Sequence, residues 1–253
     1  DYQRARRYLE ESLALFQALA DKRAGCLVLN NLGELANDQG EHERAAALLK
    51  EAQLLTEELG DKWLLAHVLA NLGSVARDKG ESEQAVQLLT ESLDLFTELK
   101  HEGGRAALLN LLGKVAHDSG DDEGAAVLSR EGLTLSRQIN DKGSPAVSLQ
   151  NLAAISLHQK DYAAAAELYR QALALFNELQ HRLDVAACLE GLAGVAGGQS
   201  RPEQVAQFLG AAAALRTAIG APLPPVDRPQ HERLSTAVRA ALAMQEALAE
   251  LNQ

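Results

Sequence analysis

The stretch NNLGELANDQGEHERAAALL, residues 30–49, decides the fold because the chain repeats it with few changes. Forty residues later the sequence is ANLGSVARDKGESEQAVQLL (70–89), and forty after that it is NLLGKVAHDSGDDEGAAVLS (110–129). Self-similarity at a fixed period is typical of repeat proteins, in which one unit cannot bury its own apolar face and stacked units can. The sequence therefore predicts a stacked array of 40-residue units.

The period holds without insertion across five units. Three columns of residues recur every forty positions: Gly33, Gly73, Gly113, Ala153 and Ala193; Leu32, Leu72, Leu112, Leu152 and Leu192; Leu29, Leu69, Leu109, Leu149 and Leu189. A glycine inside a helix costs about 1 kcal/mol relative to alanine. We therefore expect the glycine column to let a neighbouring helix come close.

Each unit is predicted to contain two helices and no strand. In the first full unit, apolar residues at 28, 29, 32, 35 and 36 have the spacing of one helical face, which indicates a helix over about 23–38. Gly40, Gly80 and Gly120 follow, as glycine does where a helix ends in a left-handed residue. A second helix extends to about Leu59.

The pattern Leu29-x-x-Leu32-Gly33-x-x-Ala36, followed by Ala45-x-x-x-Leu49, resembles the tetratricopeptide repeat signature, although that family's usual unit has 34 residues. The resemblance covers residues 1–220, as a half repeat (1–22) and five 40-residue repeats from 23. It implies an all-α, right-handed superhelical solenoid of antiparallel helical hairpins that binds proteins.

The two ends of the chain depart from the repeat. Asp1-Tyr2 aligns with Asp161-Tyr162, so the chain opens in the middle of a unit, and we expect it to be a piece of a longer protein. The face of residues 1–20 would then lack a neighbour and could self-associate. At the other end, residues 221–253 are predicted to form a proline-rich turn and a capping helix.

The stretch FLGAAAALRTAIGAPLPPVDRPQHERL (208–234) resembles the C-terminal end of tetratricopeptide arrays in bacterial signal-transduction ATPases of the STAND class. That resemblance implies the sensor part of a larger bacterial regulator. The ATPase itself is not in this sequence, which contains no GxxxxGK[ST] phosphate-binding loop.

Composition and motifs exclude several function classes. The net charge of −11 disfavours nucleic-acid binding by this segment, and no apolar run is long enough to span a membrane. Cys26 and Cys188 are expected to be buried thiols of a cytoplasmic protein. The seven histidines form no HExxH motif, and GxSxG is absent. We therefore expect no enzyme activity, no metal and no cofactor.

By the family resemblance, the first helix of each hairpin lines the concave surface of the superhelix. Asparagine recurs at its inward positions, and in similar members of the family asparagine often holds a peptide backbone, since an amide both donates and accepts a hydrogen bond. The alternative is that these amides tie adjacent helices together or face water. Both remain open from the sequence.

An aspartate also recurs at the end of the first helix, at Asp38, Asp78 and Asp118, with His158 in the fourth unit. A carboxylate there opposes the helix dipole. The column either selects basic groups on a partner or bonds locally. The candidate groove residues are Asn30, Asn31, Glu34, Asp38, His67, Asn71, Arg77, Asp78, Asn110, Lys114, Asp118 and Asn151.

Two functions follow from this pattern. In the first, the groove binds a protein or extended peptide, possibly a basic one, as the sensor of a larger regulator. In the second, the array is a structural scaffold or self-association module with no ligand in the groove.

Overall fold

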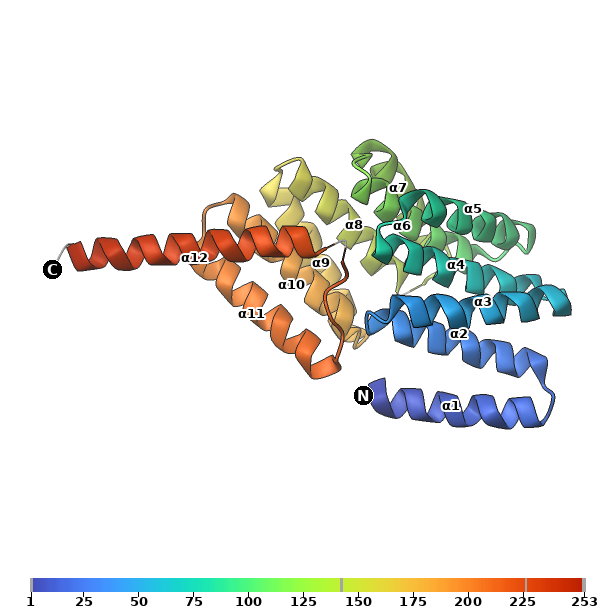
Figure 1. Ribbon diagram of the computed structural model, residues 1–253. Coiled ribbons are helices and arrows are strands. Elements are labelled where there is room, and N and C mark those ends of the chain that lie inside the picture. Colours follow the sequence, from blue (N-terminus) through green and yellow to red (C-terminus); the bar gives the residue numbers. More distant parts are fainter. Residues whose placement is uncertain (1, 142, 226, 252–253) are drawn as a thin grey trace.

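The computed structural model describes residues 2–141, 143–225 and 227–251, and its regular elements there are all helices (Figure 1). They are α1 (Tyr2–Ala18), α2 (Lys22–Asp38), α3 (His42–Leu59), α4 (Lys62–Lys79), α5 (Ser82–Glu98), α6 (Glu102–Asp118), α7 (Asp122–Gln138), α8 (Ser144–His158), α9 (Tyr162–Glu178), α10 (Arg182–Gly198), α11 (Pro202–Ile219) and α12 (Arg228–Leu251). The predicted all-α helical-repeat solenoid is confirmed.

The hairpins stack in chain order, from α2–α3 to α10–α11 (Figure 1). Within this stack the first helices also contact each other, α2 with α4, α4 with α6, α6 with α8 and α8 with α10. They form a continuous layer, whose side chains build the site described below. None of the described helices combines the length and the hydropathy that crossing a bilayer would require.

A left-handed residue ends a helix every twenty residues. The φ angles of these residues lie between 52° and 88°, and the positions are Ala20, Gly40, Gly60, Gly80, Lys100, Gly120, Asn140, Lys160, Gln180, Ser200 and Gly220. The prediction for Gly40, Gly80 and Gly120 is confirmed. After several of these turns an aspartate begins the next helix: the side chains of Asp21, Asp61, Asp121 and Asp161 each accept a hydrogen bond from the backbone N–H three residues on.

The glycine column allows close packing inside each hairpin, as predicted. A Cβ added at Gly33 would lie 2.5 Å from Leu49 Cγ, and one at Gly73 would lie 2.6 Å from Leu89 Cδ2. At Gly113 the obstacle would be Ser129 Oγ, at 2.8 Å. The second helix of the hairpin therefore occupies the space that a side chain would need.

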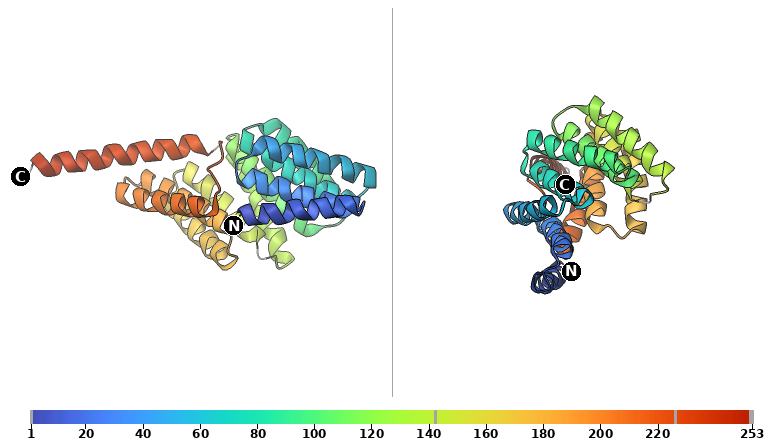
Figure 2. Two further views of the ribbon diagram at one scale, coloured as in Figure 1. Left: turned by 60° about the horizontal axis from the view of Figure 1, so that its bottom comes forward. Right: turned by 90° about the vertical axis from the view of Figure 1, so that its right-hand side faces the viewer.

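The ends of the array differ. Leu234 and Val238 of α12 pack on the cluster that contains Val205 and Leu209, and the rest of α12 extends beyond the last hairpin (Figure 2). At the other end α1 contributes no fully buried residue: its Leu15 is 65% exposed, and Leu19, directly after the helix, is 73% exposed.

Candidate functional site

Two adjoining cavities lie on the inner surface formed by the first helices. One, of about 210 Å³, is lined by residues of α2, α4 and α6, including Glu34, Asn71 and Ser74. The other, of about 140 Å³, extends from α4 and α6 to α8, α9 and α10. Arg77 and Lys114 line both cavities, which are therefore neighbours. Polar side chains from consecutive repeats thus face one extended space.

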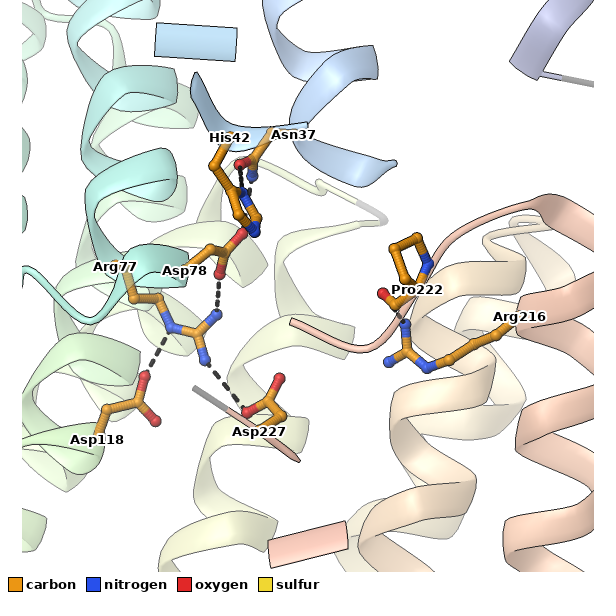
Figure 3. Close-up of polar contacts among 8 residues, drawn as sticks. All are labelled: Asn37, His42, Arg77, Asp78, Asp118, Arg216, Pro222 and Asp227. Atoms are coloured by element: carbon orange, nitrogen blue, oxygen red, sulfur yellow. Dashed lines mark hydrogen bonds and ion pairs between the residues drawn. The ribbon is translucent and has the colours of Figure 1, made fainter. Parts of the chain in front are cut away.

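Arg77 is the central side chain of this space, although only 7% of it is exposed (Figure 3). Its Nε donates to Asp118 Oδ2 at 2.7 Å, and its Nη1 donates to Asp78 Oδ1 at 2.7 Å. Asp78 also accepts a hydrogen bond of 2.8 Å from Asn37 Nδ2. Two members of the aspartate column therefore bond to a neighbouring residue and to the adjacent repeat, which is the local alternative raised by the sequence.

The buried asparagines join adjacent first helices. Asn71 Nδ2 donates to Asn30 Oδ1 at 3.0 Å, and Asn151 Nδ2 donates to the carbonyl oxygen of Asn110 at 2.8 Å. Asn110 is also bonded to α8, through the Ser144 carbonyl and the Ser148 hydroxyl. These bonds are the tie between helices that the sequence left open. Contact of the amides with a partner stays a prediction.

Asp38 lies in a different electrostatic environment from Asp78 and Asp118. Burial raises its pKa from the ordinary 3.8 to about 6, and the negative charges of Glu34, Asp184 and Asp78 add to the rise, against a hydrogen bond from Tyr2. Burial also raises the pKa of Asp184. Carboxyls with raised pKa values are common at functional sites.

The predicted groove residues separate into four groups. Eight of them line the cavities: Glu34, Asp38, Asn71, Arg77, Asp78, Lys114, Asp118 and Asn151. Asn30 and Asn110 are buried behind this surface, and Asn31 is exposed and lines neither cavity. His67 lies elsewhere, in an aromatic cluster with Trp63 and Phe96 at centroid distances of 4.3 and 5.0 Å.

Several cavity residues were not predicted from the sequence. These residues are Tyr169, Leu223, Asp227 and His231, which line the smaller cavity. Glu190, whose position in the sequence predicted an inward negative charge, lines the same cavity, and its carboxylate accepts hydrogen bonds of 2.6 and 2.9 Å from Arg216. Leu223 and Asp227 belong to the proline-rich segment after α11, which approaches the inner surface of distant repeats (Figure 3). No repeat column contains this segment, so no periodic signal pointed to it.

One cluster has the donors of a metal site. His117 Nδ1 and His158 Nδ1 each lie 2.6 Å from an oxygen of Asp122, and the three ligand atoms are within 4.8 Å of one another. Two imidazoles and a carboxylate are a set that zinc uses. The same geometry also fits two neutral imidazoles that donate to one carboxylate. The cluster ties the third repeat to the fourth.

The sequence matches family profiles described as tetratricopeptide repeat over residues 23–98, 64–138 and 146–179. No curated protein matches it. Among solved structures, the apo form of RapI is similar with a TM-score of 0.71 and 18% identity, over 86% of this chain and 78% of RapI. These matches agree with the repeat predicted from the leucine and glycine columns.

Two further solved structures have the same fold. A Rap protein complexed with Competence and Sporulation Factor gives a TM-score of 0.65 at 17% identity, over 77% of this chain and 56% of its own. A STAND protein with a tetratricopeptide repeat sensor, from Pyrococcus horikoshii, gives 0.56 at 16% identity, over 91% of this chain and 38% of its own. The array thus resembles that sensor region in fold.

Proposed function

The chain belongs to the tetratricopeptide repeat family, and from that premise we propose that it is a non-catalytic module whose inner surface binds an extended peptide or protein segment. The observation that carries the proposal is the pair of neighbouring cavities lined by charged and amide side chains of consecutive repeats. An extended chain that lies along the first helices would meet one set of these side chains after another. The Rap protein complexed with a factor on this fold supports the same assignment.

The charges of the inner surface indicate which groups of a ligand would be stabilised there. The carboxyls of Glu34, Asp38 and Asp184 gather at one end, where a basic group of the ligand would be stabilised. Arg77 and Lys114 line the same cavity as Glu34 and Asp38, and the charge of Lys114 acts on Asp184. As in the STAND protein of similar fold, the module would serve as the sensor of a larger bacterial regulator in the cytoplasm.

Selection from a library of phage-displayed 12-residue peptides tests the proposal. We expect peptides that bind the wild-type chain and lose at least tenfold in affinity to Glu34→Arg, since Glu34 is exposed and lines the larger cavity. Glu51→Arg is the matched control, because Glu51 is exposed on α3 and lines neither cavity. Peptides equally sensitive to both variants, or to neither, would place binding elsewhere.

A second candidate function, self-association, is favoured by residues 1–20, where Tyr8, Leu15 and Leu19 are 47%, 65% and 73% exposed. Light scattering across a concentration series would show a dimer that Leu15→Lys and Leu19→Lys together abolish. A monomer at all concentrations would leave only the ligand-binding proposal.

A further inference from the structure

The segment of residues 221–227, here called the strap, leaves α11 and lies against repeats far away in the sequence. Its residues 221–225 and 227 are described. Pro222 packs on the turn between α2 and α3, so closely that a Cβ added at Gly40 would lie 2.9 Å from Pro222 Cγ. Asp227 Oδ1 lies 3.8 Å from Arg77 Nη2 of α4. The strap thus joins the last hairpin to the first two (Figure 1).

Two arginines hold the strap by its backbone. Arg216 Nη1 donates to the carbonyl oxygen of Pro222 at 3.4 Å, and Arg228 Nε donates to that of Leu223 at 3.2 Å. Two residues of the strap, Leu223 and Asp227, line the smaller cavity. Proline favours an extended backbone whose carbonyls stay free to accept. The strap is therefore held through the carbonyls of Pro222 and Leu223 and then turns before α12, since the N–H of Asp227 donates to the carbonyl oxygen of Pro224 at 3.1 Å.

The contact between the strap and Arg77 is incomplete. Arg77 Nη2 is buried and makes no hydrogen bond, while Nε and Nη1 each bond an aspartate at 2.7 Å. Asp227, at 3.8 Å, forms an ion pair with Nη2 but is too far away for a hydrogen bond. An unsatisfied buried donor is costly, and guanidinium binds carboxylate better than any other common group. Arg77 Nη2 is thus a buried donor that a carboxylate oxygen within hydrogen-bond distance would satisfy.

We propose that the cavity beside Arg77 and Lys114 recognises a carboxylate on a proline-containing peptide, and that the strap is its displaceable internal ligand. The proposal rests on the proposed function and names the ligand of that site. A ligand in trans whose carboxylate reaches Nη2 within hydrogen-bond distance satisfies the donor that Asp227 leaves unpaired. Binding then requires that the strap leave Gly40 and Arg77.

Gly40 offers a way to displace the strap without touching the cavity. Gly40→Ala drives a Cβ into Pro222 and also strains a residue at φ 74°. Gly60→Ala is the matched control, because Gly60 has φ 64° and open space around its Cβ position. Only the first variant pushes on the strap. Leu223→Ser/Asp227→Asn weakens the strap directly and serves if Gly40→Ala does not fold.

The probe is a fluorescein-labelled peptide of residues 221–229, APLPPVDRP, with two companions that carry Asn or Lys in place of the Asp. Fluorescence anisotropy measures their binding to the full chain. We expect the Asp peptide to bind Gly40→Ala at least fivefold more tightly than the wild type or Gly60→Ala. We also expect the Asn and Lys peptides to lose at least tenfold, and Lys114→Ala in the displaced background to weaken the Asp peptide.

Equal binding of the Asp, Asn and Lys peptides would overturn the carboxylate assignment. Equal binding of the Asp peptide to wild type, Gly40→Ala and the double strap variant would overturn the role of the strap. If library peptides bind in a Glu34-dependent manner while no strap peptide binds, this inference fails and the proposed function stands. If neither kind of peptide binds, both fail.

Discussion

At the centre of the inner surface, Asp78 and Asp118 flank the buried Arg77, whereas Asp38 has no cationic partner within the described ranges and lies near Glu34 and Asp184 instead. All three aspartates occupy the same position of successive repeats. The difference comes from the preceding column, where Asn37, Arg77 and His117 are equivalent. The residue before the column aspartate therefore decides the chemistry of the junction between repeats: an amide at Asn37, a guanidinium at Arg77 and an imidazole at His117.

Among the variants that test this comparison, Arg77→Met is expected to lower the free energy of unfolding most. Removing the guanidinium leaves Asp78 and Asp118 as carboxylates without their cation, with side chains only 13% and 17% exposed. Loss of one partner of a buried ion pair costs about 3–5 kcal/mol of the free energy of unfolding. Urea unfolding followed by circular dichroism measures it. Lys114→Met is the control, since Lys114 lines the same cavities and forms no ion pair within the described residues. We expect it to change stability by less than about 0.5 kcal/mol.

Asp38→Asn tests the opposite end of the surface. The folded-state pKa of Asp38, about 6, is above its ordinary 3.8, so folding binds a proton and the wild type gains stability as pH falls from about 6 to 4. At pH 7.5 the ionised carboxyl costs up to about 3 kcal/mol, at 1.36 kcal/mol per pKa unit. The variant should therefore be more stable than the wild type at pH 7.5, and its stability should change less with pH.

Urea midpoints of both chains at pH 4.5 and 7.5 measure this effect. The amide oxygen of the variant can still accept the hydrogen bond of Tyr2, so that contact is kept. Asp94→Asn, at an exposed position of α5, is the matched control. A pH profile that is the same for wild type and Asp38→Asn would mean that Asp38 is not destabilised by its neighbours.

The smallest effect is expected at the imidazole junction. Asp122→Asn weakens two hydrogen bonds, from His117 and His158, and removes the charge that both imidazoles face. Because His158 is 65% exposed, we expect a loss of only about 1 kcal/mol at pH 7.5. The same urea titration measures it. A loss as large as that of Arg77→Met would contradict the ranking of the three junctions.

Much of the fold could be predicted because the pattern of one helical hairpin recurs every 40 residues. The glycine column predicted where helices approach closely, and Gly33 and Leu49 confirm it. Eight of the candidate groove residues line the cavities, and their contact with a partner stays a prediction. The bonds of the asparagines were left open. An offset of 41 residues, as in Asn30–Asn71 and Asn110–Asn151, was the available signal, because it places a side chain beside the next first helix.

The strap could not be predicted in the same way. Its contact with Gly40 depends on how far each hairpin rotates and rises relative to the previous one, summed over the array. No pattern within residues 221–227 predicts the total rotation and rise of the array. His67 was assigned to the groove from its column alone, and its aromatic neighbours Trp63 and Phe96 hold it elsewhere.

The regular turns and the strap together have a consequence for how such a gene can change. With a left-handed residue at every twentieth position, unequal recombination between two units keeps the local register and adds or removes whole hairpins. The contact of Pro222 with Gly40 does not tolerate this freedom, because it spans a fixed number of hairpins. The strap therefore fits only one array length. A chain with one hairpin duplicated or lost would still form its hairpins, but Pro222 would no longer reach Gly40.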